Sequence, residues 1–285
     1  MGNTCSRLDV AVGETSLVMY GIAAWNIRAS DKQEHDRARY RLPLKLRVFR
    51  DMGFQAVSLS RYAPYPEEEE EFELLREYDA VTIHIPCPAK IEELRQAVRI
   101  HRVTGRVRWV SFDAVLREDY LDYESTARCL NYAFDLLEEE GIGLLIENWT
   151  FEPEDFLLIK EKADIPDLGL LIDIGHLNLY VRRMGKRADE YIEALPLEIH
   201  ELHLHDNDGV RHLHLPLHTR QGSILPIMGD AVNGLKRTGF DGIVTLEVIP
   251  YGQRVYIKDE GGMASIIRTR EIFEDYWSQP TWSHV

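Results

Sequence analysis

The chain has 285 residues, 45% of them apolar, and can therefore bury a large core. Its formal net charge of −15 argues against nucleic acid as a partner, because affinity for nucleic acid comes largely from neutralised phosphates. The sequence has no apolar run of ~18 residues that would span a membrane, and its start lacks the layout of a secretory signal. Three scattered cysteines suggest no disulfide framework and a reducing compartment, so we expect a cytoplasmic protein. We also expect a small-molecule substrate, and a homodimer is left open.

Short apolar segments alternate with segments of helical periodicity along the whole chain. The expected strands are 16–25, 55–60, 79–86, 107–112, 143–148, 168–173, 199–206 and 242–248. The expected helices are 36–52, 67–78, 89–103, 122–140, 153–163, 187–195, 226–238 and 262–277. Strict alternation is typical of a parallel sheet, and eight such units with nearly continuous apolar strands predict an α/β fold, a single closed (β/α)8 TIM barrel.

The start of the chain lies outside this alternation. Residues 1–6 fit the N-myristoylation pattern, which is short enough to arise often by chance. We therefore interpret 1–16 as a flexible N-terminal tail and 17–285 as the barrel domain.

Polar residues stand at the C-terminal ends of four consecutive expected strands: Glu147, Asp173, His203 and Glu247. In a barrel these ends meet on one face, which holds the active site. Three carboxylates gathered there repel one another, and a divalent cation removes that repulsion. A separately satisfied polar residue would explain any one of them, whereas four on consecutive strands predict a metal site.

Four motifs carry a family resemblance: IEN at 146–148, DIGH at 173–176, HLHDN at 203–207 and the glutamate of TLEV at 247. In this order they resemble the xylose-isomerase-like barrels, the superfamily that also holds endonuclease IV. The resemblance implies that Glu147, Asp173, His203 and Glu247 bind the metal ion.

Two branches of that superfamily use the metal differently. Sugar isomerases and epimerases keep one metal ion and move a proton with two carboxylates, which here are Glu147 and Glu247. The hydrolytic branch adds histidines that build further zinc positions and activate water. By resemblance, His84, His176 and His214 match such additions and are candidates for a second metal ion or for the substrate. His176 also matches a residue that hydrogen-bonds substrate in isomerases, and is a third catalytic candidate.

The sequence also departs from the hydrolytic branch. His212 replaces the aspartate of its DxH motif, and the strand at 107–112 leads into Asp113 where the endonucleases have a histidine. A complete trinuclear site is therefore not expected. We expect His205 to point away from His203, either behind the ligands or outward. His212 is interpreted as an ordinary loop residue.

A narrower resemblance comes from ELHLHDNDG at 201–209, together with IDIGHLNL at 172–179 and IENW at 146–149. These segments are similar to the cobamide-remodelling amidohydrolases, which hydrolyse the nucleotide loop off a corrinoid and leave adenosylcobyric acid. A large flat substrate would need aromatic and basic side chains at the rim, where Trp25, Arg28 and Trp149 are predicted. Ordinary rim packing is the alternative interpretation of these three residues.

The resulting prediction is a metal-dependent hydrolase that cleaves an amide or phosphodiester bond with metal-activated water. The alternative is a sugar or polyol isomerase or epimerase, and a third class is a binding barrel that a metal ion merely stabilises. Additional imidazoles favour zinc as the cofactor, whereas the oxygen-rich set of Glu147, Asp173, His203 and Glu247 alone would also suit Mn²⁺ or Co²⁺.

Overall fold

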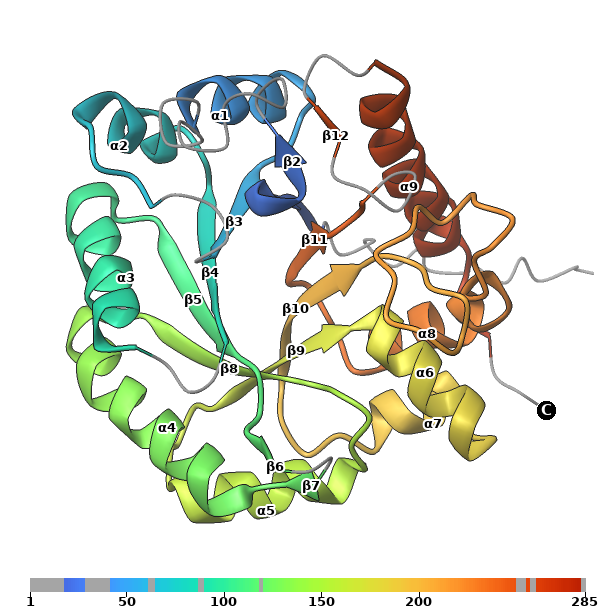
Figure 1. Cartoon of the computed structure of the whole chain (residues 1–285). Coiled ribbons are helices and arrows are strands. Elements are labelled where there is room, and N and C mark those ends of the chain that lie inside the picture. Colours follow the sequence, from blue (N-terminus) through green and yellow to red (C-terminus); the bar gives the residue numbers. More distant parts are fainter. Residues whose placement is uncertain are drawn as a thin grey trace, which may run out of the picture.

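The computed structural model describes residues 18–28, 42–60, 65–86, 90–117, 120–249, 255–256 and 260–282. The predicted tail at 1–16 and the start of the helix predicted at 36–52 lie outside them. The barrel strands are β1 (Met19–Ala23), β3 (Ala56–Ser60), β4 (Ala80–Ile85), β5 (Val107–Phe112), β8 (Gly143–Glu147), β9 (Gly169–Asp173), β10 (Ile199–Leu204) and β11 (Ile243–Leu246). They close in the order β1-β11-β10-β9-β8-β5-β4-β3, with parallel pairing throughout (Figure 1). Each strand falls inside its predicted range, and the (β/α)8 barrel is confirmed.

Helices surround the strands as an outer layer (Figure 1). They are α1 (Leu42–Asp51), α2 (Glu69–Arg76), α3 (Ile91–Thr104), α4 (Tyr123–Leu137), α5 (Pro153–Ala163), α6 (Ile174–Met184), α7 (Ala188–Glu193), α8 (Leu225–Arg237) and α9 (Glu260–Ser278). Their apolar faces pack on the outward side chains of the strands, such as Leu94 of α3 in one cluster with Ile83 of β4. None of the described helices is both long and apolar enough to cross a membrane.

The inside of the barrel changes from apolar to polar along the strands. Ala56, Ala80 and Ile243, each the first residue of its strand, form a small separate cluster with Met19 and Trp109. Further along the same strands, the residues that share a face with this cluster include Thr82, His84, Thr245 and Glu247. The strand pattern therefore closes one end of the barrel with apolar side chains and gathers polar ones at the other.

The sequence analysis missed helix α6, since it predicted no helix between 173 and 187. Asp173 ends β9 and at the same time caps α6, because its Oδ1 accepts a hydrogen bond from the His176 backbone N–H at 2.9 Å. Gly175 in the first turn resembles a loop residue, which conceals the start of the helix in the sequence. Gly185 ends α6 with a left-handed backbone, φ 64°.

Four short strands were also not predicted. β2 (Ile27–Arg28) pairs with β12 (Val255–Tyr256), and β6 (Leu116–Arg117) pairs with β7 (Tyr120–Leu121). Two residues are too few to show a period of two, so sequence periodicity cannot identify such strands.

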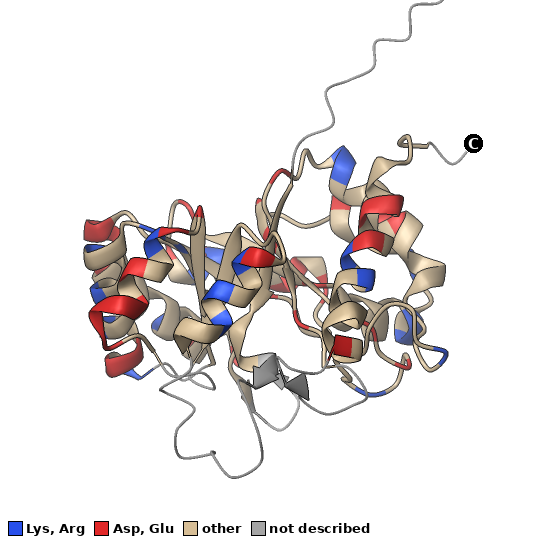
Figure 2. Cartoon of the chain, turned by 90° about the horizontal axis from the view of Figure 1, so that it is seen from above, with Lys and Arg blue, Asp and Glu red and all other residues tan. Residues whose placement is uncertain are grey.

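One buried carboxylate joins α7 to α8. Acidic and basic residues are interspersed on the helices around the barrel (Figure 2), and Asp189 of α7 belongs to an ion-pair network that is only partly exposed. Its carboxylate accepts hydrogen bonds from Arg187 Nη2 at 3.0 Å and Arg237 Nη2 at 2.8 Å. Burial alone would raise the pKa of Asp189, but the two guanidinium groups outweigh that effect and lower the pKa below its ordinary value.

We expect Asp189→Asn to lower the free energy of unfolding at neutral pH by about 1–3 kcal/mol, because it removes a charged acceptor for two arginines. A lowered folded-state pKa means that the ionised carboxylate stabilises the fold above its unfolded pKa. That contribution is lost as the pH falls through the folded pKa. Urea unfolding curves across this range should therefore show the variant and the wild type converging at acid pH.

Glu190→Gln is the matched control. Glu190 pairs with the same Arg187 at 3.6 Å but its side chain is 69% exposed. Exposed pairs contribute about 0–1 kcal/mol, so this variant should remain close to the wild type. Equal losses in the two variants would contradict the role assigned to burial.

Candidate active site

A cavity of about 440 Å³ lies at the carboxyl ends of the barrel strands. All seven residues predicted for the metal sites and catalysis line it: His84, Glu147, Asp173, His176, His203, His214 and Glu247. Trp25 and Trp149 of the predicted rim also line the cavity. The side chain of Arg28 lies outside what the structure describes.

The four predicted metal ligands come together. Glu147, Asp173 and His203 each offer a ligand atom, and these atoms lie within 4.8 Å of one another. His203 and Asp173 are direct neighbours in the β9–β10 pairing. Glu247 Oε2 lies 3.4 Å from His203 Nδ1. All four side chains are at least 94% buried, so strand register and burial bring one nitrogen and three carboxylates into one place.

The charges in this group fit a bound cation. Burial raises the pKa of Glu247, His203 opposes the rise, and the nearby Glu147 and Asp173 add to it. Burial would lower the pKa of His203, but Glu247, Glu201 and Glu147 outweigh it and raise the pKa to about 10. The shift of the His203 pKa, and part of the shift of the Glu247 pKa, arise from an excess of buried negative charge. A divalent ion relieves the same excess, and carboxylate with imidazole is a donor set that zinc and manganese accept.

His176 and His84 lie on either side of Glu147. Nδ1 of His176 lies 3.2 Å from Glu147 Oε1 and 2.6 Å from the Asn148 carbonyl oxygen. Nδ1 of His84 lies 3.4 Å from Glu147 Oε2. Burial disfavours the charged imidazoles, but neighbouring carboxylates (Asp173 and Glu147 for His176, Asp113 and Glu147 for His84) raise both pKa values to about 9.

Asp113 is a site residue that the sequence analysis did not select. Its Oδ1 lies 3.6 Å from His84 Nε2, and it lines the cavity. Asp113, His84 and Glu147 form one of the groups able to hold a metal ion. Its place directly after the strand at 107–112 was the available signal, since the predicted ligands also stand at strand ends.

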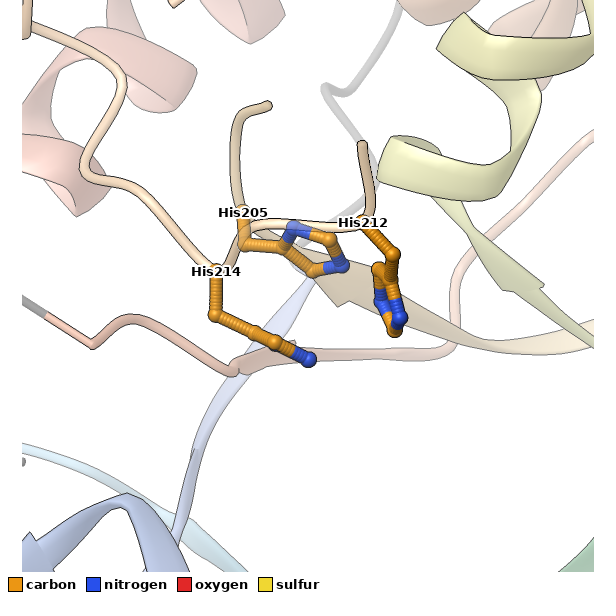
Figure 3. Close-up of side chains that lie close together, drawn as sticks. All are labelled: His205, His212 and His214. Atoms are coloured by element: carbon orange, nitrogen blue, oxygen red, sulfur yellow. The ribbon is translucent and has the colours of Figure 1, made fainter. Parts of the chain in front are cut away.

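Three histidines of one loop form a second cluster, shown in Figure 3. The ring centroids of His205 and His214 are 4.2 Å apart, and those of His212 and His214 are 4.5 Å apart. A nitrogen of each of the three rings lies within 4.8 Å of the other two. The backbones of Asp206 and Leu215 pair in an antiparallel bridge, which returns the chain and brings His214 back beside His205.

This cluster corrects two predictions. His205 does not point outward: its side chain is fully buried, and Nε2 lies 2.9 Å from Asp173 Oδ2. The prediction misapplied the alternation rule, because residues two apart on a strand share a face, so His205 follows Glu201 and His203 toward the interior. His212 is not an ordinary loop residue, since it lines the cavity and contacts the rings of His205 and His214.

The predicted second-metal set of His84, His176 and His214 does not form a single group. His84 clusters with Asp113 and Glu147, His176 with Asp173 and His212, and His214 with His205 and His212. The three histidines thus lie on different parts of the cavity wall.

The two tryptophans pack edge-to-face on histidines at the cavity wall. The ring centroids of Trp25 and His214 are 5.5 Å apart, and those of Trp149 and His176 are 4.1 Å apart. Each indole supports an imidazole and also borders the cavity. The arrangement therefore accommodates both interpretations of the rim, packing and substrate contact.

Comparison with known proteins identifies the family. A family model described as "Xylose isomerase-like TIM barrel" matches residues 46–268. An uncharacterized protein of Methanocaldococcus jannaschii, MJ1311, is 26% identical over 156 residues, which make up 52% of this chain and 46% of that protein. The chain thus spans about half the length of this curated relative.

Solved structures share the fold at low sequence identity. IolI protein with a bound zinc atom is 15% identical over 92% of this chain and 100% of that chain, with a TM-score of 0.64. L-ribulose 3-epimerase is 17% identical over 94% and 89%, with a TM-score of 0.60. D-allulose 3-epimerase from Methylomonas sp. is 12% identical over 92% and 98%, with a TM-score of 0.66. The family match, with the barrel and its cavity, gives the conclusion that the chain belongs to the xylose isomerase-like TIM barrel family.

Proposed function

We propose that the protein is a divalent-metal-dependent hydrolase that cleaves an amide or phosphodiester bond in a small or mid-sized molecule. One observation carries this proposal. The cavity holds many more imidazoles than the single ligand His203, because His84, His176, His212 and His214 also line it. Additional histidines are what a hydrolytic site needs for further zinc positions and for stabilising developing charge.

Glu147, Asp173, His203 and Glu247 would hold the first metal ion. The three buried carboxylates supply the negative charge that attracts it, and a bound cation in turn favours the ionised form of Glu247. When bound, such an ion lowers the pKa of water and polarises a scissile carbonyl or phosphoryl group. Zinc suits this set together with the nearby imidazoles, and Mn²⁺ or Co²⁺ would suit its oxygen atoms.

The surrounding side chains supply proton transfer and charge stabilisation. Glu247 accepts a proton more readily than an ordinary carboxylate, since burial raises its pKa. His176 and His84 each approach a different oxygen of Glu147, which fixes the orientation of that carboxylate. In the metal-free site neighbouring carboxylates raise the pKa of both imidazoles to about 9, and both rings line the cavity, where they would contact a substrate.

Two observations favour particular substrates. Trp25 and Trp149 give the cavity flat aromatic edges, which suit a corrinoid whose nucleotide loop would be hydrolysed to leave adenosylcobyric acid. Glu147 and Glu247 both line the same cavity, which supports the alternative function of a sugar or polyol isomerase or epimerase with these two as proton carriers. The names of L-ribulose 3-epimerase and D-allulose 3-epimerase show this chemistry on the same fold.

Glu147→Gln tests the first metal position. Removing a residue that hydrogen-bonds a metal ligand lowers metal affinity about 10–100-fold, so removing the ligand itself should lower metal affinity more than about 100-fold. We expect the variant to lose its metal by elemental analysis and to lose activity, while its circular dichroism spectrum stays unchanged. Glu152→Gln is the matched control, because Glu152 bonds to Lys186 and Tyr180 outside the cavity. Unchanged metal content in Glu147→Gln would overturn the assignment.

A metal count separates the hydrolase from the isomerase. Burial lowers the pKa of His212 to about 3 and that of His214 well below its ordinary value, so both imidazoles are neutral ligands at neutral pH. For the hydrolase we expect more than one zinc ion per wild-type chain, and His214→Ala should remove one ion and keep the first. A turnover screen should show product release from a corrinoid or a phosphodiester. A single ion per chain with ketose epimerisation would favour the isomerase instead.

A further inference from the structure

A buried glutamate lies inside the barrel beneath the candidate metal ligands. Glu201 stands on β10 two residues before His203, so both side chains face the interior. Its side chain is fully buried. Glu201 is not among the predicted ligands, and it does not line the cavity.

Glu201 spans the interior of the barrel. Its Oε1 accepts a hydrogen bond from Thr245 Oγ1 at 2.6 Å, on the neighbouring strand β11. The same oxygen accepts a hydrogen bond from Thr82 Oγ1 at 3.0 Å, on β4. In the closed strand order β4 lies four strands from β10 in either direction, and is therefore opposite it. The glutamate thus joins two opposite walls of the barrel.

The two hydroxyl groups do not fully satisfy this carboxylate. Its Oε2 has no hydrogen-bond partner among the described residues. An ionised carboxylate without water is costly to bury unless a donor or positive charge compensates it. The imidazole nearest to it supplies such a group, because His203 Nε2 lies 3.6 Å from Oε1 and likewise has no hydrogen-bond partner in the described part of the chain.

The ring of His203 lies between two carboxylates. Nε2 faces Glu201 in the interior, and Nδ1 lies 3.4 Å from Oε2 of Glu247, which lines the cavity. Metal-ligating histidines generally donate the N–H of their other ring nitrogen to a carboxylate, carbonyl or water, and this bond fixes the ring and its tautomer.

We propose that Glu201 is a positioning residue for His203. It accepts the Nε2–H of His203 and so turns Nδ1, with its lone pair, toward the cavity as the metal-binding atom. This inference rests on the proposed metal function, and it assigns the ligand atom within that site. It also accounts for a carboxylate at a depth where an apolar residue would otherwise pack.

Glu201→Gln tests the inference, because it keeps the shape of the side chain and an oxygen for Thr82 and Thr245 but removes the charge. We expect zinc affinity, measured by competition with a chelator, to fall about 10–100-fold. The Nε2–H proton of His203, observed by ¹⁵N-edited NMR, should move upfield and exchange faster with water. This NMR readout applies to metal-free protein and depends on no activity.

Thr82→Val is the matched control, since it removes one hydrogen bond to Glu201 and keeps the charge facing His203. We expect zinc affinity and the Nε2–H signal to stay near wild type in this variant. If Glu201 only held the barrel together, both variants would lose stability alike, and neither would change the affinity or the signal. That result would overturn the inference.

The outcomes separate this inference from the proposed function. If wild-type protein binds no divalent ion, the proposed function fails, while the NMR signal still decides whether Glu201 holds His203. If zinc binds equally to wild type and Glu201→Gln and the signal is unchanged, the inference fails and the function stands. Should Glu201→Gln not fold, Glu201→Asp withdraws the carboxylate by one methylene. A faster-exchanging Nε2–H and weaker zinc binding would then support the inference, and no change in either would overturn it.

Discussion

The crowding of buried carboxylates at one end of the barrel is the constraint on which the site depends. Glu147, Asp173 and Glu247 are nearly inaccessible to water, and the charges of Glu147 and Asp173 add to the effect of burial in raising the pKa of Glu247. Five histidines have a ring nitrogen within 4 Å of a carboxylate oxygen: His84, His176, His203, His205 and His214. The carboxylates raise the pKa of the first four, whereas burial lowers that of His214. The histidines are thus part of one charge balance, in which a metal ion would replace protons as the compensating charge.

The barrel makes this concentration of charge structurally tolerable. Outward side chains of the strands are apolar and pack under the helices, so the polar residues sit on a rigid frame. Asp173 illustrates the coupling of frame and site. Its backbone N–H donates to Asn148 Oδ1, and its carboxylate caps α6 while it faces His205. A residue fixed by three elements leaves its carboxylate little freedom, which is the preorganisation that a metal ligand requires.

Features that depend on strand periodicity could be predicted from the sequence, whereas contacts between elements distant in the sequence could not. All eight barrel strands and the four candidate ligands could be found, because apolar runs that end in a polar residue are visible in one dimension. His205 was misplaced because strand alternation was misapplied: residues two apart share a face, so His205 faces the same side as His203. The place of Asp113 in the site is shown by its contact with His84. That of Glu201 is shown by its hydrogen bond with Thr82 on the opposite wall of the barrel. Such cross-barrel relations have no signature in a single sequence.

In the proposed function, the loop after β10 supplies the histidines that favour hydrolysis over isomerisation. The barrel ligands suit both isomerisation and hydrolysis, whereas His212 and His214 belong to residues 205–224, between β10 and α8. Asp206 holds that loop: its Oδ1 accepts backbone N–H groups of Asn207, Ser223 and Ile224 at 2.6–3.0 Å. A side chain at Gly222 would overlap the second oxygen of Asp206, so only glycine lets the loop close around it. A barrel likeness that shows the fold alone therefore leaves the reaction open. Asp206 thus fixes the loop that carries His212 and His214, the two histidines on which the proposed hydrolase function depends.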